Sequence, residues 1–214
     1  MSIDFYDKLS DLSSLSCLIP LCLVYSIFRL RSSLLLPLGI LILVSFITET
    51  ISYVLLSKGS NNLEAFRIYT IIELILLSSF YMLHFKLKKL NIIVFFSVII
   101  FLIVSIIDFN VNGTNNFDNY ATTFEAFFFS ILSFWSFYYM LKHLSFKDPL
   151  RQPFFWINTA VLLYFGGNLI LFIFNNQLLH SNNSDHLILW SIHSCLNILY
   201  NCLIAVAFWK TRRP

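Results

Sequence analysis

Long apolar runs alternate with short polar connections along the whole of this chain. A run of about 20 apolar residues is long enough to cross the hydrocarbon core of a bilayer as a helix. The connections between the runs leave no room for a soluble domain. The pattern predicts an all-α, polytopic integral membrane protein, in which residues 1–214 form a single domain of seven transmembrane helices. The segments are Leu12–Phe28, Leu34–Leu56, Ala65–Phe85, Leu90–Ile107, Tyr120–Leu141, Pro153–Phe174 and Leu187–Trp209.

Composition agrees with a membrane protein and argues against a soluble one. The chain is 58% hydrophobic and 12% charged, whereas soluble domains carry about 25% charged residues. The acidic opening stretch has no basic region before an apolar run, so we expect no cleaved signal peptide. The four cysteines form no CxxC pair and lie inside apolar segments, which is typical of small core residues. Nothing indicates an oligomeric state.

The Lys and Arg residues are distributed unevenly over the connections. Eleven of the fourteen fall on one side of the predicted membrane, and only Lys8, Lys58 and Arg67 fall on the other. Positive residues collect on the cytoplasmic side of membrane proteins. We therefore predict an N-terminus outside, a C-terminus in the cytoplasm and a multi-pass location in the cell inner (plasma) membrane. This charge is spread over short loops and does not indicate a nucleic-acid partner. The eleven residues are Arg29, Arg31, Lys86, Lys88, Lys89, Lys142, Lys147, Arg151, Lys210, Arg212 and Arg213.

Polar residues lie along one side of the last apolar segment. Trp190, His193, Asn197, Tyr200 and Asn201 are spaced three and four residues apart, as on one face of a helix. Polar groups inside a membrane are costly unless they face protein or water. This helix is therefore expected to pack against earlier segments through its polar side.

Three glutamates lie well inside the predicted spans, each in a different segment. At 1.5 Å of rise per residue, Glu49 lies about 10 Å, Glu73 about 12 Å and Glu125 about 8 Å below the predicted outer end of its helix. The same arithmetic places Asn168 and His193 at about 9 Å. Five segments therefore carry their strongest polar group in the outer half of the membrane.

This coincidence of depth favours a polar pocket that opens to the outside and binds a small polar or cationic ligand. Ionisable groups inside membranes are usually functional. The alternative is that the same groups bond to one another and hold the helices together. Clustered carboxylates should also raise one another's pKa and make the site sensitive to pH or cations. The predicted pocket residues are Glu49, Glu73, Glu125, Tyr164, Asn168, His193 and Asn197.

Two other function classes stay open from the residues alone. A small-solute transporter would suit seven spans, although the internal repeat typical of such proteins is missing. An intramembrane metal-dependent enzyme could use the three glutamates and His193, but this set is specific for no metal and no cofactor is indicated. The chain contains none of the phosphate-loop, G-x-S-x-G or HExxH motifs. Gly166-Gly167 allow either close helix packing or a hinge, and packing is the better supported reading.

The last two segments resemble a known group of proteins. The resemblance rests on Pro153-Phe-Phe-Trp156, on Tyr164 with Gly166-Gly167, on Trp190-Ser-Ile-His193 with Asn197 and Asn201, and on Phe208-Trp209-Lys210. Together these are similar to bacterial seven-helix membrane modules that occur alone or ahead of a histidine kinase region. The resemblance implies a sensory or signalling role. No kinase region follows Lys210 in this sequence, so the output is expected to pass through a separate cytoplasmic partner, such as a histidine kinase.

The leading hypothesis is therefore a receptor-like sensory module embedded in the lipid bilayer. Ligand binding on the outside would change the packing of the helices and thereby their cytoplasmic ends. The basic connection Lys142–Arg151 is the expected contact for a partner.

Overall fold

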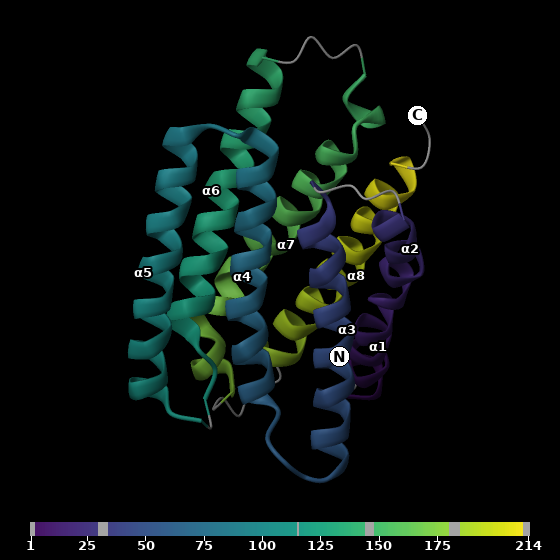
Figure 1. The fold of residues 1–214 in the computed structure, drawn as a ribbon. Coiled ribbons are helices and arrows are strands. Elements are labelled where there is room, and N and C mark those ends of the chain that lie inside the picture. Colours follow the sequence, from purple (N-terminus) through teal and green to yellow (C-terminus); the bar gives the residue numbers. More distant parts are fainter. Residues whose placement is uncertain (1–2, 30–33, 115, 144–147, 180–184, 212–214) are drawn as a thin grey trace. The chain divides into compact units, whose positions relative to one another are not determined.

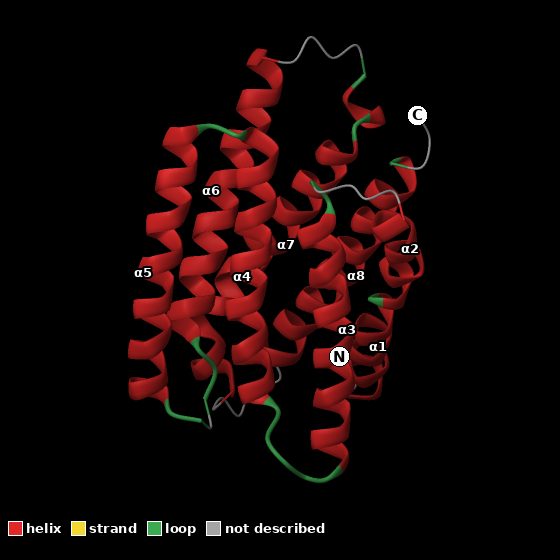
Figure 2. Cartoon of the chain, viewed as in Figure 1, coloured by secondary structure: helices red, strands yellow, loops and turns green. Residues whose placement is uncertain are grey.

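A computed structural model describes residues 3–29, 34–114, 116–143, 148–179 and 185–211. Within these ranges every regular element is helical, and about 90% of the described residues are in helices. Figure 2 shows helices joined by short loops. The elements are α1 (Ile3–Ser16), α2 (Leu18–Arg29), α3 (Leu36–Ser57), α4 (Leu63–Phe85), α5 (Lys88–Asn112), α6 (Asn119–His143), the 3-10 helix η1 (Pro149–Arg151), α7 (Pro153–Leu179) and α8 (Asp185–Lys210).

Seven helical stretches in the described residues are long and apolar enough to cross a membrane. Each corresponds to one of the segments expected from the hydrophobic pattern, so the prediction of seven membrane-length helices is confirmed. The second begins at Leu36 rather than at the predicted Leu34, because residues 34 and 35 form a turn. Most of the other helices extend beyond the predicted segments because polar residues continue them past the apolar runs. The stretches are Asp4–Arg29, Leu36–Ser57, Leu63–Phe85, Lys88–Asn112, Asn119–Lys142, Pro153–Leu178 and Leu187–Lys210.

The first of these stretches is interrupted near its middle. α1 ends at Ser16, Cys17 forms a turn, and α2 begins at Leu18. Pro20 has no backbone N–H and therefore cannot donate to the carbonyl of Ser16, which ends the regular ladder there. The next residue resumes the helix, since the Leu21 N–H donates to the Cys17 carbonyl at 3.2 Å. Proline is tolerated in the first turn of α2 because the N–H groups of a first turn have no acceptor within the helix, so the missing N–H of Pro20 breaks no bond there.

The described helices group into two compact units, which we treat separately. Unit 1 contains residues 1–26 and 125–214, and unit 2 contains residues 27–124. The single domain predicted for residues 1–214 stays a prediction.

In unit 1, α8 is the central helix. It packs against α7 and against α1, and Figure 1 shows α8 beside both. The buried residues include Phe129 of α6, Ile157, Val161 and Phe165 of α7, and Phe208 of α8. Phe129 and Phe165 pack with their ring centroids 5.0 Å apart. Large apolar side chains therefore form a core between the helices.

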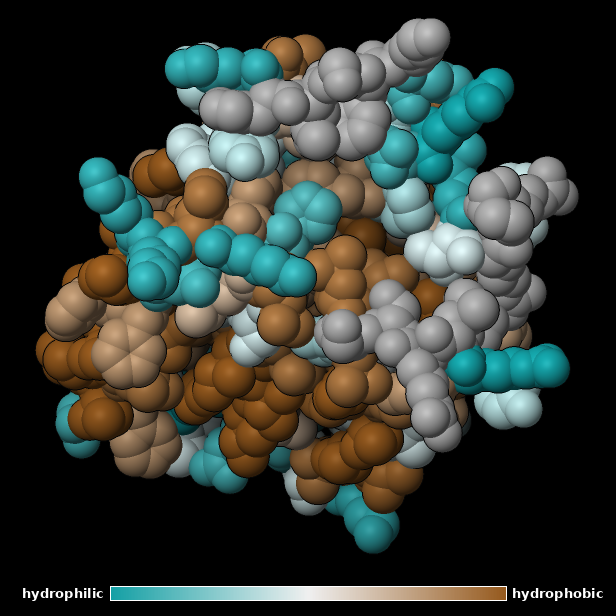
Figure 3. Space-filling model, turned by 45° about the horizontal axis from the view of Figure 1, so that its top comes forward, coloured by the Kyte–Doolittle hydropathy of each residue, from teal (hydrophilic) through white to brown (hydrophobic). Residues whose placement is uncertain are grey.

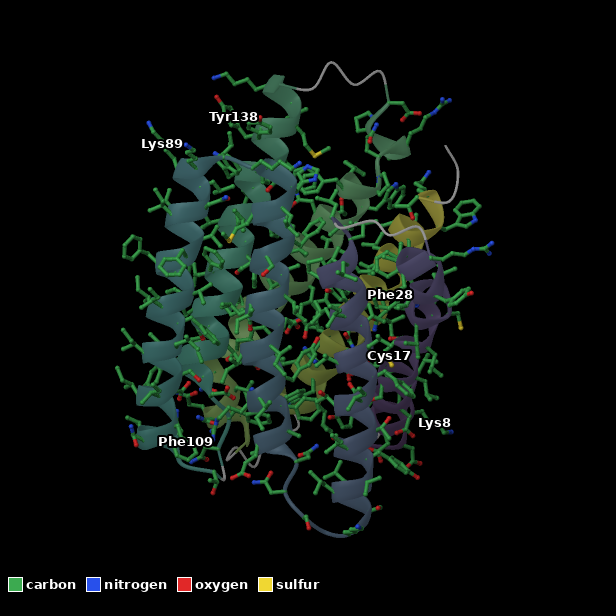
Figure 4. The ribbon with its side chains drawn as sticks, viewed as in Figure 1. Lys8, Cys17, Phe28, Lys89, Phe109 and Tyr138 are labelled. Carbon is green, nitrogen blue, oxygen red and sulfur yellow. The ribbon has the colours of Figure 1, made fainter. Side chains whose placement is uncertain are left out.

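In unit 2, α4 lies between α3 and α5 (Figure 1). The buried residues of α5 are three, four or seven positions apart and mark one face of that helix: Leu90, Val94, Phe101, Ser105 and Asp108. Lys89 and Phe109, labelled in Figure 4, lie toward opposite ends of α5.

Most of the other α5 side chains are apolar and exposed, among them Ile93, Phe96, Ile103 and Ile107. Exposed apolar side chains occur on the other helices too and appear as brown areas in Figure 3, beside hydrophilic teal ones. Such surfaces are compatible with contact with a lipid bilayer.

Candidate functional site

One face of α7 carries aromatic and amide side chains in alternation. Tyr164, Asn168, Phe172 and Asn175 are four, four and three residues apart, so they lie on one side of the helix. The predicted common face of Tyr164 and Asn168 is confirmed by the continuous helix that holds both. Asn168 is 1% exposed and Asn175 is 4% exposed.

His193 of α8 packs against this face of α7. Its ring centroid is 5.9 Å from that of Tyr164 and 6.2 Å from that of Phe172. Trp190, one turn earlier in α8, lies 5.5 Å from His193 and nearly perpendicular to it. Tyr200 adds a fourth ring, 5.2 Å from Tyr164. The imidazole is therefore held within a group of aromatic rings from two helices.

Asn168 lies between the two α7 residues that contact His193. Tyr164 is one turn before it and Phe172 is one turn after it, so His193 is opposite Asn168 in the helix pair. We call Tyr164, Asn168, Phe172, Asn175, Trp190, His193 and Tyr200 the α7–α8 site.

Several buried polar atoms in this site accept no hydrogen bond from any residue that the structure describes. They are Oδ1 of Asn168, Oδ1 of Asn175 and Nδ1 of His193. The orientation of the Asn168 amide is set by its Nδ2, which donates to the Tyr164 carbonyl at 2.9 Å. A buried polar atom without a partner costs about 1–3 kcal/mol, so a group of them needs an explanation.

Gly167 allows α7 and α8 to approach closely beside this site. A Cβ atom at Gly167 would lie 2.6 Å from Cδ1 of Leu196, whereas a Cβ at Gly166 would find its nearest neighbour, the Ser130 Oγ, at 3.6 Å. The close contact supports the packing interpretation of the glycine pair, and only one of the two glycines is needed for it.

Asn197 and Asn201 join α8 to α1. Asn197 Nδ2 donates to Ser13 Oγ at 3.0 Å, and Asn201 Nδ2 donates to Ser16 Oγ at 2.7 Å. The Ser16 hydroxyl in turn donates to the Ser13 carbonyl at 2.6 Å. These bonds place the Asn197 amide in the contact between the two helices, and its predicted role in ligand binding stays a prediction.

Glu125 belongs to the same unit but lies on α6, where it is 3% exposed. α6 is joined to α7 by the Asn158 amide, whose Nδ2 donates to the Ser133 carbonyl at 3.0 Å. Of the seven predicted pocket residues, unit 1 therefore contains five, and the structure brings Tyr164, Asn168 and His193 together.

The other two predicted residues, Glu49 and Glu73, lie in unit 2 on the neighbouring helices α3 and α4. Glu73 is buried, and the Tyr69 hydroxyl donates to its Oε1 at 3.1 Å, as their shared helical face predicts. Glu49 is half-buried. A common site for these two residues and the five of unit 1 stays a prediction.

Unit 2 also contains a charged group that the sequence did not single out. Arg67 of α4 is 8% exposed, and its Nη2 donates to the Gly113 carbonyl at 2.9 Å. Its Nε is 4.0 Å from Oδ2 of Asp118, and its guanidinium lies 5.0 Å from the centre of the Phe109 ring. Asp108 is fully buried and accepts from the Ala121 N–H at 2.9 Å and from the Asn112 amide. This group ties α4 to the connection between α5 and α6.

The surroundings of the Asp118 carboxyl group in this cluster change its pKa. Burial raises its pKa above the ordinary value of 3.8, and the Asp108 carboxylate adds to the rise. A backbone hydrogen bond and the Arg67 guanidinium act in the opposite direction without cancelling the effect of burial.

Sequence reasoning missed Phe172 and Asn175 in the α7–α8 site. Their spacing from Tyr164 and Asn168 is regular, so extending that helical face by two turns would have found them. It missed Asp108 because this residue follows the last apolar position of its segment. Arg67 was counted as a loop charge, and only the packing of the connection onto α4 shows that it is buried.

The described residues contain no group of three or more His, Cys, Asp or Glu side chains arranged to hold a metal ion. The α7–α8 site has the chemistry of hydrogen-bond acceptors and aromatic faces. Comparison with family models, with curated proteins and with solved structures found no match to this chain.

Proposed function

We propose that this chain is a receptor-like sensory module of the inner (plasma) membrane that binds a small polar or cationic ligand at the α7–α8 site. In this proposal the N-terminus lies outside and the C-terminus in the cytoplasm, as the distribution of Lys and Arg favours. A separate cytoplasmic protein, such as a histidine kinase, receives the signal.

The observation that carries the proposal is the set of buried acceptors without partners among the described residues. Packing alone would be served better by apolar side chains at Asn168 and Asn175. A ligand that donates hydrogen bonds would satisfy these atoms and draw α7 and α8 together. Ligand affinity would then depend on how the two helices pack, which is what a sensor requires.

The same two helices also meet at the ends that would face the cytoplasm. Lys210 Nζ of α8 lies 5.7 Å from the centre of the Trp156 ring of α7, and Trp156 Nε1 donates to the Leu150 carbonyl at 2.8 Å. A shift between α7 and α8 would therefore reach η1, which is part of the basic connection Lys142–Arg151 that we expect a partner to contact.

The experiment is thermal unfolding of the purified chain in mild detergent with a panel of small polar and cationic solutes. A ligand of the native state raises the melting temperature. We expect a solute that does so for the wild type to lose this effect in His193→Ala and Asn168→Leu. A fluorophore attached through Thr211→Cys should report the same binding event at the end of α8.

Solutes that stabilise wild type and both variants equally would count against the α7–α8 site. Binding that leaves the fluorophore unchanged, together with no cytoplasmic protein recovered in a pull-down under any condition, would count against the signalling role.

The break between α1 and α2 favours a second candidate, a small-solute transporter. Transporters build their sites from helices interrupted near the middle of the membrane, and Cys17 interrupts the first membrane-length stretch near its centre. Uptake into vesicles that contain the purified chain separates the two candidates, because a sensor accumulates no solute. Solute accumulation that His193→Ala abolishes would favour the transporter.

A further inference from the structure

The α7–α8 site offers buried hydrogen-bond acceptors that have no partner among the described residues. Asn168 Oδ1, Asn175 Oδ1 and His193 Nδ1 are three such atoms. An amide oxygen is an acceptor, and Nδ1 of a neutral imidazole is an acceptor when the proton is on Nε2. The matching ligand therefore donates hydrogen bonds.

The surrounding rings favour a positive charge on that donor. Tyr164, Phe172, Trp190 and Tyr200 are linked to one another or to His193 by ring contacts of 5.2–6.5 Å. Aromatic faces attract cations, by about 2 kcal/mol or more where water is excluded. A neutral donor, such as a sugar hydroxyl, would satisfy the acceptors without this gain.

The helices themselves supply no positive charge at this point. α7 contains no Lys or Arg, and α8 contains none before Lys210 at its end. An anion would meet acceptor atoms and the negative faces of rings with no counter-ion from α7 or from α8 before Lys210. The site therefore selects against anions as well as for cations.

From this geometry we propose that the α7–α8 site binds the ammonium group of a small organic amine. Asn168 Oδ1 and His193 Nδ1 accept hydrogen bonds from its N–H groups, and the rings of Tyr164, Phe172, Trp190 and Tyr200 surround its charge. This inference rests on the proposed function and narrows its ligand class. Asn175 lies two turns from Asn168, about 10 Å along the helix, and would contact a second donor on a longer amine.

The test is isothermal titration calorimetry of the chain in lipid nanodiscs with n-butylammonium, neutral n-butanol and tetramethylammonium. n-Butanol has nearly the same shape as n-butylammonium without the charge, and tetramethylammonium has the charge without N–H donors. We expect saturable binding of n-butylammonium at least about tenfold tighter than that of either other probe, since both the donors and the charge contribute.

Asn168→Leu should weaken the binding of n-butylammonium by about tenfold or more. Its matched control is Asn110→Leu, because Asn110 also donates from Nδ2 to a carbonyl four residues earlier, at 2.9 Å, but is exposed on α5. Phe172→Leu keeps the acceptors and removes one ring, so it should reduce the preference for n-butylammonium over n-butanol. This second variant keeps the test valid if Asn168→Leu does not fold.

The ammonium proposal is overturned if n-butanol binds as tightly as n-butylammonium, or if Asn168→Leu and Phe172→Leu bind all probes like the wild type. In the first case, if binding still depends on Asn168, the receptor proposal survives with a neutral ligand. If no probe binds and no solute of the wider panel shifts the melting temperature, both proposals fail.

Discussion

Two adjacent glycines in α7, Gly166 and Gly167, have different surroundings. A methyl group added at each position would therefore meet different neighbours. At Gly167 the added carbon would press on the Leu196 side chain at 2.6 Å, whereas at Gly166 the nearest atom is at 3.6 Å. Glycine lowers helix stability by about 1 kcal/mol relative to alanine. The two substitutions should therefore have opposite effects.

We expect Gly166→Ala to raise the free energy of unfolding by up to about 1 kcal/mol. Gly167→Ala should lower it by about 1–3 kcal/mol, because Leu196 must move. Thermal unfolding in detergent measures both. Adding Leu196→Ala should relieve part of the loss in Gly167→Ala. Equal effects of the two glycine substitutions would contradict the close approach of α7 and α8.

The Asp118 carboxyl gives a prediction with a defined sign. Its pKa is higher in the folded chain, so the folded state holds more protons than the unfolded state between the ordinary value of 3.8 and the raised one. This contribution to stability is present below the ordinary value and is lost as the pH rises through the folded pKa. Asp118→Asn should remove that loss.

The measurement is the melting temperature of wild type and Asp118→Asn from about pH 3 to about pH 8. We expect the wild type to become less stable than the variant as the pH rises, with Asp11→Asn, at an exposed position on α1, as the control. If Asp118→Asn instead becomes less stable than the wild type at high pH, the attraction between the Asp118 carboxylate and Arg67 is larger than the cost of burying that carboxylate.

At the scale of helices, the position of α1 depends on its hydrogen bonds with α8. α1 contains Asp4, Asp7, Lys8 and Asp11, so it is a poor membrane helix by itself. Two Asn–Ser pairs, four residues apart on α8 and three apart on α1, hold it in place. The shared Ser16 hydroxyl, which accepts from Asn201 and donates to the Ser13 carbonyl, links the two pairs.

A double-mutant cycle of Ser16→Ala and Asn201→Ala should give a coupling energy of about 0.6 kcal/mol and at most about 1.7 kcal/mol, the range found for hydrogen bonds between membrane helices. Chemical denaturation in mixed micelles gives the four free energies. Ser14→Ala, paired with the same asparagine, is the control and should show no coupling. Additive effects of Ser16→Ala and Asn201→Ala would contradict the contact.

For the whole molecule, the uneven distribution of Lys and Arg predicts the orientation in the membrane. In a variant without native cysteines, Ser60→Cys between α3 and α4 should react with an impermeant maleimide in intact cells. Leu150→Cys in η1 should react only after the membrane is opened. The reverse labelling pattern would indicate the opposite topology, in which the basic connections lie outside.

Much of this fold could be predicted because the signal is local. The length of an apolar run determines whether a helix can span a bilayer, and each of the seven runs became such a helix. The face shared by Tyr69 and Glu73 was likewise readable from helical spacing. The contacts Asn201–Ser16 and Arg67–Asp118 were not, because they join residues distant in the chain. The grouping of Glu49 and Glu73 with His193 depends on such contacts and stays a prediction.

The contact between α1 and α8 has a consequence for biosynthesis. Ser13 and Asn197 are 184 residues apart, so the ribosome releases α1 long before the helix that holds it exists. In the proposed membrane topology, the translocon would hold this charged, proline-interrupted segment during that interval without the contacts that α8 later makes to it. We therefore expect chains truncated after α7 to be recognised by membrane quality-control proteases, whereas chains that include α8 escape them.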